Sequence, residues 1–190
     1  MTNRNFSLPH RLLHWLIAFT MLFILMTIFL RENWMSKYYM RDVILNYLGT
    51  FDIEITKDQA MKVAKAIRGN MWQWHINAGY LLIGLYVLRL LTNAKEKGIK
   101  LNFLSSNDMT GREKVEGWVY FIFYVCIAGS LITGMSLIYD IGDHELMEDM
   151  HKLSLYYLVS FIVIHFFGIV VGELRDKKNI VSKMIHGKNN

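Results

Sequence analysis

Four histidines lie inside the long apolar segments of this chain: His14, His75, His151 and His165. His151 and His165 share one segment and are fourteen residues apart, which is close to four turns of an α-helix. Both side chains should therefore leave the same helix face, separated by about 21 Å of helical rise. An ionisable side chain inside a membrane span is a candidate functional site. Two imidazoles on one face indicate two stacked cofactors with a path for electrons between them.

The elements that must position these histidines are four apolar runs, at about 11–30, 72–91, 117–139 and 151–173. Each is near the roughly 20 residues that a helix needs to cross a bilayer. A hydrophobic content of 53% with one proline is unlike a soluble domain. Runs this long and unbroken do not suit barrel strands. We predict an all-α integral membrane four-helix bundle, surrounded by lipid, as a single domain over 1–190. The alternative is a soluble helical protein.

The position of charge predicts how the spans are oriented. Cytoplasmic loops collect Lys and Arg. The two tails and the second loop carry twelve such residues, and the first loop carries seven against five acidic residues. The third loop, 140–150, has none and holds five carboxylates: Asp140, Asp143, Glu145, Glu148 and Asp149. We therefore expect both termini in the cytoplasm. Positive charges that flank spans rather than share one face argue against nucleic-acid binding.

The first loop contains two candidate helices. Thr56 and Gln59 have the spacing of a capping box, apolar residues at helical spacing follow, and Gly69 suits a C-terminal stop. We predict a short amphipathic helix over 57–68 at the outer membrane surface, which would cap the bundle or dock a partner. A second helix is predicted over 36–48.

With the termini inside, helical rise gives each histidine a depth. His14 is sixteen residues, or about 24 Å, from Leu30 at the outer end of its span. His165 is about 21 Å inward from His151, so it lies level with His14. His75 and His151 both open their spans at the outer side. The depths therefore pair His75 with His151 outside and His14 with His165 inside.

Paired imidazoles suit haem iron, and a bis-His haem carries electrons because neither axial position is open to substrate. The one cysteine, Cys126, excludes an intramolecular disulfide, a thiolate-held iron–sulfur cluster and the Cys-x-x-Cys-His attachment of c-type haem. We predict haem ligation by the four span histidines, with zinc, a proton relay or methionine ligation as alternatives. The remaining histidines are assigned no ligand role: His10, His144 and His186.

Three cations are candidate partners of haem propionates. Arg89, near the cytoplasmic end of its span, would bind the inner haem or reach to the interface. Arg11, one turn before His14, is a second candidate for the inner haem. Lys152, beside His151, would serve the outer haem or mark the membrane surface. Four glycines would remove bulk where a macrocycle or a helix approaches: Gly79, Gly84, Gly129 and Gly134.

The whole chain resembles the bacterial cytochrome b561 and nickel–iron-hydrogenase cytochrome b superfamily. The resemblance is carried by HRLLHW at 10–15, WQWH with GYLLIG over 72–84, the His151/His165 spacing, ITG at 132–134 and VSKMIHGK at 181–188. It implies a four-helix subunit of the bacterial inner membrane with two b-type haems on the same four histidines. Such subunits move electrons between a periplasmic partner and quinone. The longer first loop and the histidine-free third span look more like the hydrogenase type than the short superoxide-oxidising type.

Two functions follow as hypotheses. In the first, electrons from a periplasmic redox protein or hydrogenase-like subunit enter at the outer haem, cross to the inner haem and reduce quinone. The acidic third loop and the first-loop helices would receive the partner. The alternative is a stand-alone superoxide:quinone oxidoreductase, which needs cations around the outer haem to attract an anion. A histidine-lined proton or metal transporter is the third hypothesis. The chain could also assemble with copies of itself as a homo-oligomer.

Overall fold

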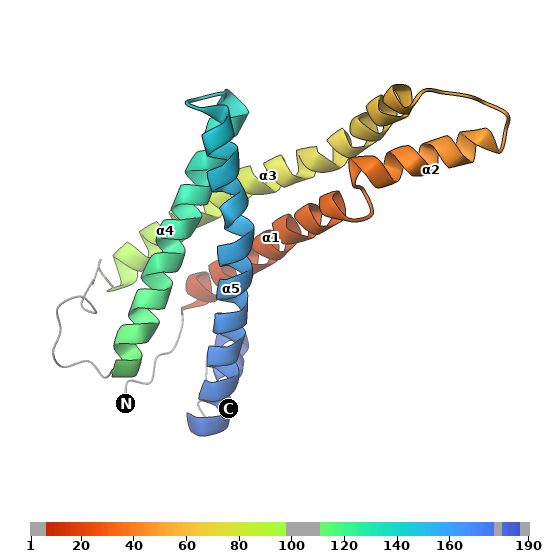
Figure 1. The fold of residues 1–190 in the computed structure, drawn as a ribbon. Coiled ribbons are helices and arrows are strands. Elements are labelled where there is room, and N and C mark those ends of the chain that lie inside the picture. Colours follow the sequence, from red (N-terminus) through yellow and green to blue (C-terminus); the bar gives the residue numbers. More distant parts are fainter. Residues whose placement is uncertain (1–6, 98–110, 177–179, 187–190) are drawn as a thin grey trace. The chain divides into compact units, whose positions relative to one another are not determined.

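The computed structural model describes residues 7–97, 111–176 and 180–186, which form helices and the turns between them. Within these ranges the chain forms six helices and no strand, which confirms the all-α prediction (Figure 1). The helices are α1 (Leu8–Glu32), α2 (Lys37–Gly49), α3 (Lys57–Lys97), α4 (Gly111–Tyr139), α5 (His144–Asp176) and α6 (Ile180–His186). Most of the basic residues predicted in the second loop and the C-terminal tail lie outside the described residues or have side chains that are not described.

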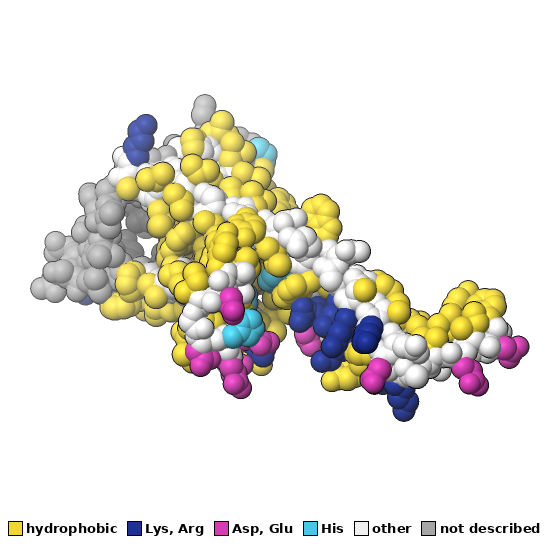
Figure 2. Space-filling view, turned by 90° about the horizontal axis from the view of Figure 1, so that it is seen from above, with side chains coloured by type: hydrophobic (Ala, Val, Ile, Leu, Met, Phe, Trp, Pro, Cys, Tyr) yellow, Lys and Arg dark blue, Asp and Glu magenta, His cyan; other side chains and the backbone are white. Residues whose placement is uncertain are grey.

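Four of these helices, α1, α3, α4 and α5, are long and apolar enough to cross a membrane. Large apolar side chains are exposed along all four, among them Phe19, Leu81, Ile132 and Phe167. Figure 2 shows such side chains over much of the face turned to the viewer. Soluble monomers rarely expose apolar patches this large, whereas lipid tails solvate such surface. The four predicted spans are therefore confirmed.

Helix α3 differs from its prediction, because it runs without a break over 41 residues. The helix over 57–68 and the span over 72–91 are one helix, and the prediction that Gly69 ends the first is wrong. A glycine ends a helix when it takes a left-handed backbone, and Gly69 keeps the helical one. A helix of this length measures about 60 Å, so it extends well beyond a bilayer core of about 30 Å. Its first turns continue the helix of the span instead of forming a separate surface helix.

The starts of the two first-loop helices agree with the sequence pattern. The backbone N–H of Thr56 donates to Gln59 Oε1 (2.8 Å), and the N–H of Gln59 donates to Thr56 Oγ1 (3.2 Å). This reciprocal pair is the predicted capping box. Helix α2 confirms the second predicted helix, and Ser36 caps it by accepting from the N–H of Tyr39.

The chain divides into two compact units. The unit Trp15–Tyr86, here the α1–α3 unit, buries small and apolar side chains together with two threonines: Thr20, Met21, Thr27, Ala60, Ala64, Ala78, Leu82 and Leu85. The other unit, Met1–His14 with Val87–Asn190, is here the α4–α5 unit. It buries His10, Ile127, Thr133 and Leu158.

Helices α4 and α5 pack side by side and are joined by a tight turn (Figure 1). Asp140 (φ 54°) and Gly142 (φ 83°) take the left-handed backbone that reverses the chain. Asp143 Oδ1 accepts from the N–H of Leu146 (2.9 Å) and caps α5. The third loop is therefore shorter than predicted, and three of its carboxylates stand in the first turns of α5. Carboxylates are stabilising there because the helix dipole is positive at that end.

Candidate metal-ligating histidines

His14 and His165 lie close together in the α4–α5 unit. Their ring centroids are 6.1 Å apart and the ring planes are inclined by 46°. A metal between two opposed imidazoles would hold the centroids about 6 Å apart, because each metal–nitrogen distance is near 2 Å and each ring centre lies about 1 Å further out. The two rings therefore have a separation that suits one iron. Helical rise alone predicted this pairing.

The ring of His165 is supported by a stack of aromatic side chains. Phe161, one turn earlier in α5, lies 5.5 Å from the His165 ring with an interplanar angle of 16°. Phe161 also stacks on Phe123 of α4, at 3.4 Å and 12°. Stacked aromatic pairs contribute about 0.5–1.5 kcal/mol beyond their buried area. The stack thus restricts the plane of His165, a role that the sequence reading missed although the four-residue spacing could have suggested it.

Arg89 joins the start of α1 to α3 and α4. Its Nη1 donates to the backbone oxygen of His10 (2.8 Å), its Nη2 donates to His10 Nε2 (2.9 Å), and its Nε donates to the hydroxyl of Tyr124 (3.3 Å). Because a guanidinium only donates, His10 must accept at Nε2 and is neutral. His10 is 5% exposed. This link spans 79 positions in the sequence, and no local pattern signalled it.

Arg11 lies one turn before His14, and its guanidinium contacts the described chain through only part of its nitrogen atoms. Its Nη1 donates to the backbone oxygen of Ile185 in α6 (2.7 Å). Its Nε is buried and has no hydrogen-bond partner among the described residues. A buried donor left without an acceptor costs about 1–3 kcal/mol. The Nε atom therefore suits an anionic group such as a haem propionate.

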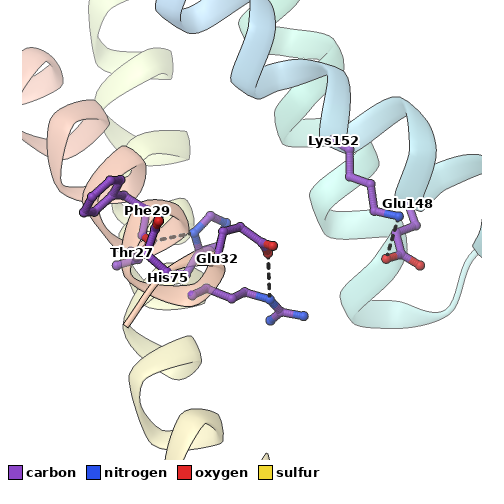
Figure 3. A network of polar contacts seen from close by, with 8 residues as sticks. Thr27, Phe29, Glu32, His75, Glu148 and Lys152 are labelled. Carbon is purple, nitrogen blue, oxygen red and sulfur yellow. Dashed lines mark hydrogen bonds and ion pairs between the residues drawn. The ribbon is translucent and has the colours of Figure 1, made fainter. Parts of the chain in front are cut away.

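Lys152 forms ion pairs with residues of its own helix, α5. Its Nζ lies 3.0 Å from Glu148 Oε1 and 3.4 Å from Asp149 Oδ1, and its side chain is 61% exposed (Figure 3). Two carboxylates one turn earlier in α5 thus already balance its charge.

His151 packs against α4 at Gly134. A Cβ added to Gly134 would lie 2.9 Å from His151 Cε1, so only glycine leaves room for the ring. His151 Nδ1 donates to the backbone oxygen of Ser130 (3.0 Å) and lies 3.3 Å from Thr133 Oγ1. A carbonyl only accepts, so Nδ1 carries the proton and the Nε2 lone pair is available to a metal.

The other predicted glycines do not mark close contacts of this kind. A Cβ added to Gly79, Gly84 or Gly129 would meet no atom within 4 Å among the described residues. The open space at Gly79, one turn after His75 in α3, leaves room for a flat group beside that histidine.

His75 lies in the α1–α3 unit, and its Nδ1 is 2.9 Å from Thr27 Oγ1 (Figure 3). Thr27 donates its one hydroxyl proton to the backbone oxygen of Ile24 (2.6 Å). The hydroxyl can therefore only accept from His75, which again places the imidazole proton on Nδ1 and the lone pair on Nε2. His75 and His151 belong to different units, and their pairing remains a prediction.

Trp72 stacks on His75, one turn earlier in α3. The ring centroids are 4.3 Å apart and the planes differ by 6°. The guanidinium carbon of Arg31 lies 3.9 Å above the centroid of the Trp72 ring. Arg31 also lines a cleft of about 290 Å³ whose other lining residues are Glu32, Ser36, Lys37, Tyr38 and Arg68. No pattern in the sequence signalled this contact or the cations that line the cleft.

Within the described ranges, no three or more His, Cys, Asp or Glu residues are grouped so that they could hold a metal ion. Zinc sites usually have three or four protein ligands. A haem needs only two axial protein ligands, because the macrocycle supplies the rest. The donor set therefore fits haem better than a bare metal ion.

Comparison with known proteins identifies a family of haem proteins. The family model described as prokaryotic cytochrome b561 matches residues 5–187. No curated protein and no solved structure gave a significant match.

Proposed function

The chain belongs to the prokaryotic cytochrome b561 family, and on this premise we propose that it carries electrons across the bacterial inner membrane through two b-type haems. The family and the four apolar helices make it a haem-binding membrane protein for transmembrane electron transfer. The observation that carries the finer proposal is the 6.1 Å separation of the His14 and His165 rings. Haem supplies reversible one-electron chemistry when it is bound.

In this proposal His14 and His165 would hold the inner haem. Iron bound by two histidines would leave no position for a substrate, which suits electron transfer. Arg11 Nε would bind a propionate, because it is a buried donor beside His14. Phe161 holds the His165 ring in place.

His75 and His151 hold the outer haem in the same proposal. Their shared feature is a proton fixed on Nδ1, by Thr27 in one case and by the Ser130 carbonyl in the other. Such hydrogen bonds orient a ligating histidine and raise its basicity. Both Nε2 atoms are then ready to ligate iron without a change of tautomer.

Electrons would enter at the outer haem from a periplasmic redox protein, such as a hydrogenase, and leave to quinone near the cytoplasmic side, where both termini lie. Helix α2 supports a docking role, because none of its residues is buried and Tyr38, Tyr39, Val43 and Tyr47 are exposed. Exposed aromatic side chains are common anchors in protein interfaces.

The test uses liposomes that contain the protein and hold trapped ferricyanide, with a membrane-impermeant reductant outside. We expect electrons to cross in the wild type, and His14→Ala or His165→Ala to stop the transfer. His144→Ala is the matched control, since His144 is an exposed histidine of the same helix as His165. Full transfer in His165→Ala would contradict the proposal.

A second candidate, a superoxide:quinone oxidoreductase, gains support from the cations near His75. Arg31, Lys37 and Arg68 line one cleft with a single acidic residue, Glu32. Cations that line a cleft raise the local concentration of an anion and its rate of arrival. Quinone reduction by superoxide, with purified protein and no partner, would favour this function over the partner-dependent one.

A further inference from the structure

We propose that Arg31 and Trp72 are positioning residues for the outer haem: Trp72 fixes the plane of the His75 ring, and Arg31 makes that haem easier to reduce. The proposal rests on the function proposed above, because it takes His75 as an axial ligand.

Two contacts of different kinds hold the His75 ring. The hydrogen bond to Thr27 fixes the direction in which Nδ1 points. The indole of Trp72 covers the ring face at 4.3 Å, with only 6° between the planes, and fixes the tilt. The one-turn spacing of Trp72 and His75 places both side chains on the same face of α3. Together the two contacts leave the ring one orientation.

Arg31, Trp72 and His75 form one stack, in which the indole of Trp72 contacts both the guanidinium of Arg31 and the imidazole of His75. Its Cζ lies 3.9 Å above the Trp72 centroid, within the range of a cation–π interaction. Stacking on Trp72 thus holds the cation near His75.

Arg31 forms a long, exposed ion pair with the next residue. Its Nε lies 3.9 Å from Glu32 Oε1, and the Glu32 side chain is 70% exposed. Ion pairs this exposed contribute little. Arg41 has a shorter ion pair than Arg31, because its Nη2 lies 2.6 Å from Asp42 Oδ1. The two arginine side chains are similarly exposed, 30% for Arg31 and 24% for Arg41.

A nearby cation should favour the reduced haem, because the iron carries one more positive charge when it is oxidised. For a unit charge about 10 Å away at an effective dielectric constant of about 20, Coulomb's law gives a change on the order of tenfold in the reduction equilibrium. Solvent screening of a partly exposed side chain lowers this to about threefold to tenfold.

The first test is a redox titration of the purified holoprotein, followed through its haem absorbance. We expect Arg31→Gln to shift the reduction equilibrium of one haem about threefold to tenfold toward the oxidised form. Arg31→Lys should retain most of the wild-type value, and the control Arg41→Gln should leave both haems unchanged. An Arg31→Gln protein with its full haem content and two unchanged haems would overturn the role of Arg31.

The second test examines Trp72 by electron paramagnetic resonance of the oxidised protein, since this signal reports how axial imidazole planes are oriented. We expect Trp72→Leu to shift or broaden the signal of one haem and Trp72→Phe to preserve it. An unchanged spectrum in Trp72→Leu would overturn the positioning role. The variant His75→Ala distinguishes a failure of the proposed function from a failure of this inference. If it keeps its full haem content, the proposed ligand is wrong; if it loses one haem, a negative result with Arg31 or Trp72 overturns this inference alone.

Discussion

The Nδ1 atom of His75 lies 2.9 Å from the hydroxyl oxygen of Thr27, and that hydroxyl donates its only proton to the carbonyl of Ile24. Thr27 is 2% exposed, so no bulk water competes for the contact. One hydroxyl thus decides which imidazole nitrogen carries the proton and which can ligate a metal.

Thr27→Val keeps the side-chain shape but removes the acceptor. We expect the affinity for the outer haem to fall about 10- to 100-fold, the usual effect of losing such a partner of a ligating histidine. Haem titration of apoprotein in detergent would measure it. Thr20→Val is the matched control, because Thr20 is another buried threonine of α1 whose hydroxyl donates to the carbonyl of Leu16. Equal affinities in the two variants would argue against the role of Thr27.

Gly134→Ala should displace His151. The new Cβ would lie 2.9 Å from His151 Cε1, and the ring cannot turn aside freely because Ser130 holds its Nδ1. We expect the variant to lose one haem per chain while it remains folded. Gly129→Ala, in the same helix, meets no atom within 4 Å among the described residues and should keep full haem content. Haem content after purification distinguishes the two, and a fully loaded Gly134→Ala protein would contradict the account.

Arg89→Gln should destabilise the fold rather than remove a haem. The arginine makes three hydrogen bonds that join α1, α3 and α4. Hydrogen bonds that involve a charged group contribute about 1.5–3 kcal/mol each, and glutamine can replace only part of them, so we expect a loss of about 2–4 kcal/mol in the free energy of unfolding. Thermal unfolding of the apoprotein in detergent measures this, with Lys95→Gln as an exposed control in α3. Unchanged stability together with lost haem would instead assign Arg89 to a propionate.

The sequence predicted the spans and the inner histidine pair because both depend on local quantities. The length of an apolar run sets a span, and helical rise alone places His14 level with His165. The capping box at Thr56 was also local, since its two hydrogen bonds join residues three apart.

Features that depend on tertiary placement could not be predicted from the sequence. Gly69 has the residue type of a helix stop, but its backbone stays helical within α3. Two contacts join residues that are distant in the chain: Arg89 with His10, and Arg31 with Trp72. No periodic pattern in the sequence predicts such contacts. The sequence pattern indicated the candidate ligands but not most of the side chains that contact them.

The central claim, two haems on two specific histidine pairs, is tested most directly by a pyridine haemochrome assay on the purified protein and its histidine variants. We predict about two haem b per chain in the wild type and about one in each single His→Ala variant. The decisive protein is the double variant His14→Ala/His165→Ala. Because both residues serve the same iron, it should still hold about one haem. A double variant that holds none, or a wild type that holds only one, would contradict the pairing.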